Sequence, residues 1–192
     1  MFQNEKAIIE AAWESREMLA QEDVREAIRR VVEAVDKGTL RCAEPIDLER
    51  SEWQVNEWVK KAIIMYFPIQ PMRTMRAGEL EWYDKMELKH GYEELGVRVV
   101  PHAIARYGAY IAPGAILMPS YVNIGAYVDT GTMVDTWATV GSCAQIGKNV
   151  HLSNAMLVML CTKEDTAVSV PFRSKILLSI LFIFLINHAP II

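Results

Sequence analysis

Two of the four histidines and one cysteine are the side chains whose types most readily support catalysis. His102 and His151 are candidate general bases, because an imidazole exchanges its proton near neutral pH. Neither histidine has an acidic residue close to it in the sequence, so a structural role is favoured for both. Cys143 follows Ser142 in an apolar stretch, where a buried structural thiol is more common than a nucleophile.

No metal or nucleotide site is predicted. The three cysteines, Cys42, Cys143 and Cys161, are widely spaced and form no CxxC pair, so neither a zinc site nor a disulfide framework is indicated. The glycine-rich patterns GxGxxG and GxxxxGK[ST] do not occur. Free cysteines are typical of a reducing cytoplasm, which is the compartment we expect.

Isolated charged residues are ambiguous. An aspartate such as Asp135, or Asp129 one repeat earlier, is usually a turn residue at a corner of the chain. Arg98 precedes an apolar run and, taken alone, is expected at the surface. Arg73 and Arg76 lie in a stretch rich in proline and glycine, Pro68 to Gly78, which predicts a loop. They are able to bind an anion, although a solvated loop is the simpler explanation.

Composition indicates a globular protein of one or two domains. The chain has 192 residues, of which 52% are apolar and 23% charged. Its net charge of −4 argues against nucleic acid as a partner, because phosphate contacts need clustered Lys and Arg. No signal peptide is visible, and the apolar run Ile176 to Ile186 is too short to span a membrane, so no membrane association is expected.

The first third of the sequence has helical periodicity. A helix from Glu5 to Leu19, capped by Asn4, is followed by a second from Glu22 to Lys37 that ends at Gly38. A third is expected from Val55 to Phe67, ended by Pro68. Their apolar stripes are, in order, Ile8, Ile9, Ala12 and Trp13; Val24, Ile28, Val31 and Val35; and Val55, Trp58, Val59, Ala62, Ile63 and Tyr66.

A strict period of six residues follows and is the strongest signal in the chain. The aliphatic series is Ile116, Val122, Val128, Val134, Val140, Ile146 and Leu152, with a backward extension through Tyr110 to Ile104. A second series of small residues is Gly114, Ser120, Ala126, Thr132, Ala138, Ala144 and Val150. One large inward residue on each short face, with a small residue near each corner, fits a triangular solenoid. We therefore expect a left-handed parallel β-helix from about Ile104 to Leu152, with Ile116, Val134 and Ile146 pointing inward.

The predicted fold is mixed, an α-helical N-terminal domain followed by a partial left-handed parallel β-helix of hexapeptide repeats. The expected division is a mainly helical domain over residues 1–95, an incomplete β-helix over 96–153 and a divergent apolar tail over 154–192. The tail contains no glycine, and its apolar residues are clustered rather than periodic.

The long stretch from Met118 to Ser153 resembles the signature of the tetrahydrodipicolinate N-succinyltransferases. The runs Gly96–Pro101, Leu40–Glu44 and Trp58–Ala62 are similar as well. The resemblance covers about residues 1–153. Its central motif is specific, whereas a six-residue period alone indicates only the wider class of hexapeptide acyltransferases.

The resemblance implies a reaction and a site. Such enzymes transfer a succinyl group from succinyl-CoA, a co-substrate, to the amino group of ring-opened tetrahydrodipicolinate in lysine and diaminopimelate biosynthesis. They are cytoplasmic homotrimers, with active sites between neighbouring β-helices and no metal. By resemblance, Arg98 binds a carboxylate of the substrate, and Asp135 lies at its amine as the catalytic residue.

The resemblance ends after Ser153. Family members continue with glycine-rich rungs that bind much of the acyl-CoA and supply an active-site glutamate, and no residue here matches them. We therefore expect this chain to have little activity and to associate readily. A catalytically inactive, truncated member of the family is the alternative interpretation.

Overall fold

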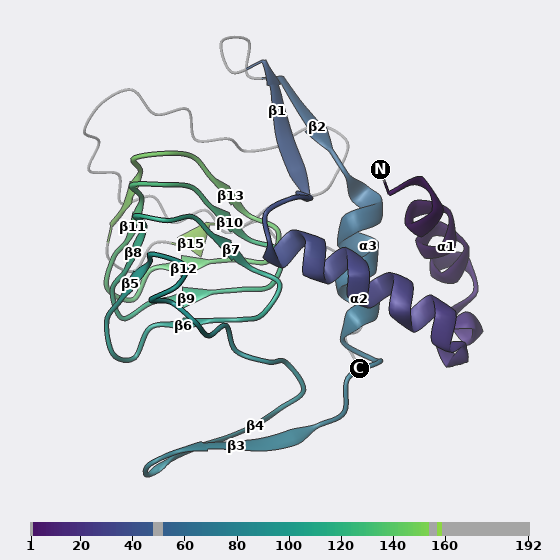
Figure 1. Ribbon diagram of the computed structural model, residues 1–192, viewed down its shortest axis with the longest axis horizontal. Helices are drawn as coiled ribbons and strands as arrows, with labels where there is room; N and C mark the ends of the chain where they lie inside the picture. The colour runs from purple at the N-terminus through teal and green to yellow at the C-terminus, as the bar shows by residue number, and fades with distance from the viewer. Residues whose placement is uncertain (1, 48–51, 154–156, 159–192) are drawn as a thin grey trace.

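A computed structural model describes residues 2–47, 52–153 and 157–158, and shows a helical layer packed beside a β-helix (Figure 1). The expectations for the tail, including Ile176 to Ile186 and Cys161, lie outside the described residues. The helices are α1 (Gln3–Glu14), a short 3-10 helix (Arg16–Ala20), α2 (Glu22–Asp36) and α3 (Glu57–Tyr66). Two hairpins accompany them, β1 (Ala43–Asp47) with β2 (Glu52–Val55), and β3 (Arg73–Ala77) with β4 (Leu80–Asp84).

The apolar faces predicted for the second and third helices are confirmed, except at Val55. The predicted face of α2 is buried, and so are Trp58, Val59, Ala62, Ile63 and Tyr66 of α3. Val55 instead lies in β2 and is 41% exposed, since α3 begins only at Glu57. Gly38 ends α2 as predicted, with a φ of 71° that a residue without Cβ adopts freely.

The first helix is shorter than predicted. It ends at Glu14 because Ser15 adopts an extended conformation, and the chain resumes as the 3-10 helix. Asn4 is the second residue of α1 and not its cap. Phe2, which directly precedes the helix, occupies the cap position without a side-chain hydrogen bond. The expected Glu5–Leu19 helix was therefore wrong at both ends.

The stretch from Pro68 to Gly78 is not a loop throughout. Arg73 to Ala77 pair antiparallel with Leu80 to Asp84, and Gly78 turns between the strands with a φ of 60°. Arg76 forms an ion pair with Glu81 across the hairpin, and Arg73 lies 3.6 Å from Glu87. Both arginines thus have carboxylate partners.

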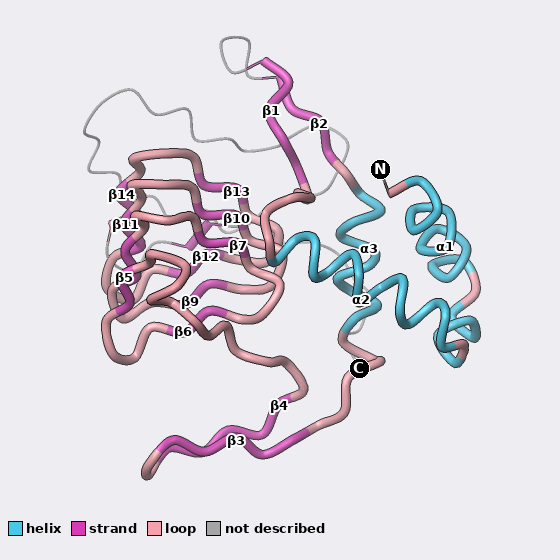
Figure 2. The backbone as a smooth tube through the Cα atoms, in the orientation of Figure 1, coloured by secondary structure: helices cyan, strands magenta, loops and turns pink. Residues whose placement is uncertain are grey.

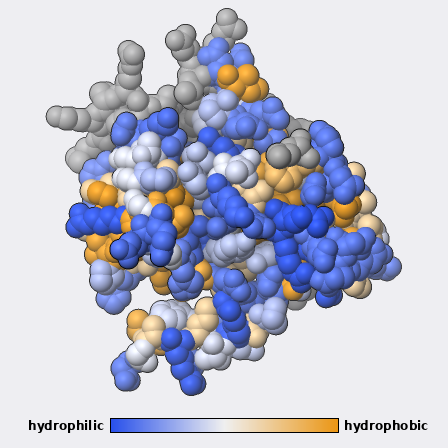
Figure 3. All heavy atoms as spheres, viewed as in Figure 1, coloured by the Kyte–Doolittle hydropathy of each residue, from blue (hydrophilic) through white to orange (hydrophobic). Residues whose placement is uncertain are grey.

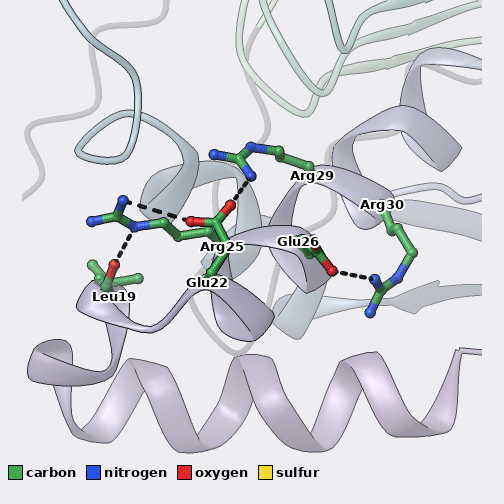
Figure 4. A network of polar contacts seen from close by, with 6 residues as sticks. All are labelled: Leu19, Glu22, Arg25, Glu26, Arg29 and Arg30. Atoms are coloured by element: carbon green, nitrogen blue, oxygen red, sulfur yellow. Dashed lines mark hydrogen bonds and ion pairs between the residues drawn. The ribbon is translucent and has the colours of Figure 1, made fainter.

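Charged side chains cover the solvent-facing side of α2. Arg25 donates to the Leu19 carbonyl, Arg29 pairs with Glu22 at 2.6 Å, and Arg30 lies 3.8 Å from Glu26 (Figure 4). The surface over the helices is accordingly mostly hydrophilic in Figure 3. Such exposed pairs contribute little to stability, so the helical layer depends on its buried face.

The predicted left-handed parallel β-helix is confirmed. Its two-residue strands stack into three parallel sheets, ordered β5–β8–β11–β14, β6–β9–β12–β15 and β7–β10–β13 (Figure 2). The strands are β5 Arg98–Val99, β6 Ile104–Ala105, β7 Tyr110–Ile111, β8 Ile116–Leu117, β9 Tyr121–Val122, β10 Tyr127–Val128, β11 Met133–Val134, β12 Thr139–Val140, β13 Gln145–Ile146, β14 His151–Leu152 and β15 Leu157–Val158.

The predicted inward series is right from Val122 onward and wrong before it. Val134 and Ile146 are buried as expected, but Leu117, at 0% exposure, is the inward residue of β8 in place of Ile116. The backward extension fails in the same way, because Ile111 and Ala105 are buried instead of Tyr110 and Ile104. The small series is displaced too, with Ala115 rather than Gly114 in the core.

One short corner explains the displacement. Met133 pairs with His151, 18 positions later, whereas Ile116 pairs with Met133, only 17 positions later. Left-handed residues recur at the other corners, namely His102, Gly108, Gly114, Gly125, Gly131, Trp137, Cys143 and Asn149. Proline cannot adopt a positive φ, so the corner at Pro119 is built without such a residue and is one residue shorter.

Matched substitutions test this register. Leu117→Ala should lower the free energy of unfolding by about 2–5 kcal/mol, because it leaves a cavity in the closed interior of the prism. Ile116→Ala should lower it by about 1 kcal/mol or less, since this side chain points away from the interior. Urea unfolding of both variants measures the difference, and a larger loss for Ile116→Ala would contradict the register.

The sheet β7–β10–β13 faces the N-terminal layer. The Arg41 guanidinium lies 3.7 Å from the centroid of the Tyr127 ring, and its Nε donates to Gln145 at 2.9 Å. A Cβ added to Gly38 would lie 2.6 Å from the Tyr110 ring, so the backbone itself contacts this sheet. This face of the prism is therefore covered, and a functional site must lie elsewhere.

Candidate functional site

The sheet β5–β8–β11–β14, which we call the site sheet, carries the residues predicted to act on substrate. Its strand register places four outward side chains in one column: Arg98, Ile116, Met133 and His151. Arg98 and His151, at the two ends, are exposed, whereas the two apolar residues between them are half-buried. The column thus has a cation at one end, an imidazole at the other and an apolar strip between.

Arg98 lies in the first strand of the site sheet, directly after Val97, which is buried in the core. The backbone N–H of Arg98 donates to the Ala115 carbonyl, which fixes its place on the ladder. Within the described part of the chain, its guanidinium has no hydrogen bond or ion pair. An exposed guanidinium without a protein partner is suited to bind a carboxylate through two parallel hydrogen bonds.

Asp135 lies at the corner that follows β11, and two neighbours hold its carboxylate. Oδ1 accepts a hydrogen bond from the backbone N–H of Thr136 at 2.7 Å, as expected for a turn aspartate. Oδ2 lies 2.9 Å from Nε2 of His151 on the next rung. The hydrogen bond to His151, followed by that from the Thr136 amide, lowers the pKa of Asp135 below its ordinary value.

His151 therefore has an acidic partner, contrary to the sequence-based expectation. That expectation considered neighbours along the chain, whereas one turn of this solenoid brings residues 18 positions apart into register. His151 stacks on Met133, two residues before Asp135. The 18-residue offset was the signal available in the sequence for finding this pair.

The other candidates from the sequence do not reach this group. His102 is exposed at a corner after β5, with a φ of 76°, and has no carboxylate partner in the described part of the chain. Cys143 is fully buried and packs in the helical core together with Cys42, in line with the predicted structural role.

Arg98 and Asp135 lie on the same side of the prism. Met133, two residues before Asp135, is two strands from Arg98 in the ladder, a separation of about 10 Å for strands about 4.8 Å apart. An extended ligand of several carbons is able to bridge that span. The site sheet therefore places an exposed cation and an acid–imidazole pair on one side of the prism.

Trp137 belongs to the same corner and was not singled out from the sequence. It is 70% exposed and has a φ of 60°, a conformation that is strained for a bulky residue. Its backbone N–H donates to the Pro119 carbonyl at 2.7 Å, which secures the strained turn. The exposed indole, two residues from Asp135, adds an aromatic surface beside the acid–imidazole pair.

The described residues contain no group of three or more His, Cys, Asp or Glu side chains placed to hold a metal ion. None of the helices in the described ranges is long and apolar enough to cross a membrane.

Comparison with known proteins now gives this site a context. Residues 4–69 match the family described as "Tetrahydrodipicolinate N-succinyltransferase N-terminal". The chain is 52% identical over 116 residues to a 2,3,4,5-tetrahydropyridine-2,6-dicarboxylate N-succinyltransferase of Coxiella burnetii, which covers 56% of this chain and 42% of that protein. The enzyme of the same name from Psychrobacter arcticus is 55% identical over 117 residues, covering 55% of this chain and 42% of that protein.

A third such enzyme, from Variovorax paradoxus, is 50% identical over 124 residues, covering 59% of this chain and 44% of that protein. The chain thus spans less than half the length of these curated relatives. Over somewhat more than half of its length, this chain is therefore similar to the tetrahydrodipicolinate N-succinyltransferases, and its first residues match the N-terminal family described for them.

Proposed function

We propose that this protein transfers a succinyl group from succinyl-CoA to the amino group of ring-opened tetrahydrodipicolinate, a step of lysine and diaminopimelate biosynthesis. The observation that carries the proposal is the site sheet, where the exposed guanidinium of Arg98, which has no partner among the described residues, lies on the same side of the β-helix as the acid–imidazole pair. The names of the relatives supply the chemistry, namely a dicarboxylate acceptor and a succinyl group. Succinyl-CoA serves as co-substrate, and no metal takes part.

The roles proposed within the site follow from charge and spacing. Arg98 binds one carboxylate of the acceptor, and Asp135, at the far end of the apolar strip, orients the amine or accepts its proton. A dicarboxylate with an amine several carbons from one carboxylate matches this separation. The half-buried Ile116 and Met133 face its methylene chain.

Arg98→Ala should weaken binding of the dicarboxylate more than it slows turnover at saturation, because the guanidinium contacts a group that does not react. We expect KM to rise roughly 10-fold or more, in line with about 1.5–3 kcal/mol for a hydrogen bond to a charged group. Steady-state kinetics measure the split between KM and kcat. Arg76→Ala, an exposed arginine of the β3–β4 hairpin, is the control and should leave both unchanged. Equal kinetics for the two variants would remove Arg98 from the site.

We further propose that the protein acts in the cytoplasm as a homotrimer, with the site sheet of one β-helix facing a neighbouring copy. The exposed Arg98 of this sheet and the exposed Trp137 beside it support this arrangement. Analytical ultracentrifugation should give three times the mass of the chain, and a monomer at micromolar concentration would contradict it.

A non-catalytic member of the family is the second candidate. The absence of glycine from residues 154–192 and of a counterpart to the family's glutamate favours it. A single-turnover assay with the protein in excess over succinyl-CoA separates the two candidates, because it detects transfer that is too slow for steady-state measurement. Formation of the succinylated product supports the transferase, and its absence supports the second candidate.

A further inference from the structure

The contact between His151 and Asp135 has the geometry of an oriented base. Asp135 is anchored at both oxygens: Oδ1 accepts from the amide of Thr136 at 2.7 Å and lies 3.3 Å from its hydroxyl, and Oδ2 contacts His151 Nε2 at 2.9 Å. The carboxylate side chain is 22% exposed, whereas the imidazole side chain is 63% exposed. The imidazole is therefore the member of the pair that a ligand reaches more easily.

The carboxylate also selects the tautomer of the ring. An ionised carboxylate only accepts hydrogen bonds, so Nε2 of a neutral His151 carries the hydrogen. Nδ1 then holds an unshared electron pair. In the described ranges, no hydrogen bond to Nδ1 occupies that pair.

We propose that His151 is the catalytic base that takes the proton from the substrate amine, and that Asp135 is its positioning residue. The proposal rests on the transferase function proposed above and assigns the proton to a residue that the resemblance did not mark. Proton transfer needs a base within reach of the amine, and the exposed ring of His151, held by Asp135 at Nε2, presents one at Nδ1. The lowered pKa of Asp135 makes its carboxylate a weak base, better suited to holding the ring than to taking a proton.

The proposed step is balanced within the two substrates and His151. The amine nitrogen attacks the thioester carbonyl carbon, a C–N bond forms, and the C–S bond breaks. The proton lost by nitrogen moves to Nδ1 of His151, and from there to the departing sulfur of CoA, which leaves as the free thiol. His151 returns to its neutral form, and Asp135 stays ionised throughout.

The charged groups around the ring in the described part of the chain are few. Asp135 faces it from the adjacent rung, and Met133, its partner in the ladder, does not titrate. Lys148 lies in the turn before β14, and Arg98 lies three strands along the site sheet. The imidazole thus has one anion in contact and two cations further away.

Three variants of the full chain test the proposal. His151→Gln keeps a donor toward Asp135 but has no base, and should lower the rate of succinyl transfer by about 10²–10⁴-fold. It should also change the pH dependence of the transfer rate, which replacement of a merely structural histidine would leave as in the parent. His151→Ala should regain activity with added imidazole, a rescue that a merely structural histidine would not show. His102→Gln is the matched control and should keep the parental rate and pH profile.

The results of these experiments distinguish a failure of the role proposed for His151 from a failure of the proposed transferase function. A parental rate and pH profile in His151→Gln would overturn the role of His151 while the transferase function stands. Lack of imidazole rescue in a slow but folded His151→Ala would also overturn it, in favour of a structural role. If the parent itself releases no CoA thiol from succinyl-CoA and tetrahydrodipicolinate, the transferase function fails, and the proposal that rests on it fails as well.

Discussion

Asp135→Ala is expected to lower the rate of succinyl transfer by about 10²–10⁴-fold, the range for loss of a group that serves proton transfer. Both oxygens of Asp135 are held in place, so its removal frees the His151 ring and takes away the charge that fixes its tautomer. The effect should fall on kcat and kcat/KM together, because the interaction is needed in the transition state. Single-turnover rates of parent and variant give the ratio directly.

Asp129 provides a control of the same kind. Its Oδ1 accepts from the Thr130 amide at 2.7 Å, as Asp135 does from Thr136, but it contacts no histidine among the described residues. Asp129→Ala should therefore remove an equivalent corner bond without slowing transfer. If transfer is slowed equally in both variants, the lower rate comes from the loss of a corner hydrogen bond and not from the loss of a group that acts in the site.

The pH dependence of the pair has a definite sign. The folded-state pKa of Asp135 is lowered, so the stabilisation from its ionised form is present above the unfolded-state pKa and is lost as pH falls through the folded value. Asp135 thus stays ionised through the mildly acidic range. Protonation of Asp135 therefore does not account for a fall in transfer rate just below neutral pH.

Asp36→Ala is expected to reduce the free energy of unfolding by about 3–5 kcal/mol, the range for leaving one member of a buried ion pair without its partner. Asp36 Oδ1 accepts from Lys89 Nζ and from the backbone N–H of Gly108, both at 2.7 Å. The Lys89 side chain is only 5% exposed, so its ammonium would stay desolvated without a counter-charge. Since Asp36 is the last residue of α2, the variant should loosen the helical layer from the β-helix. Urea denaturation measures the loss.

Two comparisons isolate the buried pair. Glu33→Ala removes the partner of Lys37 in an exposed pair on the same helix and should cost less than about 1 kcal/mol. The double variant Asp36→Leu with Lys89→Met should lose less stability than Asp36→Ala alone, because no unpaired charge remains. If the double variant is as unstable as Asp36→Ala, the loss of stability comes from packing and from the lost hydrogen bond to Gly108, and not from the unpaired charge.

The parts of the fold that depend on repeating side-chain patterns were predictable. The buried face of α2 follows from the spacing of apolar residues on a helix. The inward residues from Val122 to Leu152 follow from the six-residue period of the prism. The error at Ile116 arose because the period was extended through a corner that is one residue short. A proline at that corner was the available sign, since it cannot take the left-handed conformation that the other corners use.

Contacts between distant segments were not predictable from spacing alone. The sequence predicts a loop where the β3–β4 hairpin forms, because Gly78 and two prolines are typical of a loop. The antiparallel pairing of the two strands is not visible in that composition. The pairing of His151 with Asp135 depends on the stacking of rungs, which a search along the chain misses. Arg98 and Asp135 themselves were singled out only by the resemblance, since an arginine before a strand or an aspartate at a corner is ordinary in itself.

Succinyl transfer by this chain, through the site sheet, is best tested in a single-turnover reaction. The full chain, in excess, is mixed with succinyl-CoA and tetrahydrodipicolinate, and the acceptor is analysed by mass spectrometry. We expect a succinylated acceptor formed together with free CoA, at a rate that falls by about 10²–10⁴-fold in Asp135→Ala and is unchanged in Asp129→Ala. No succinylated acceptor from the parent, or an equal rate from Asp135→Ala, would contradict it.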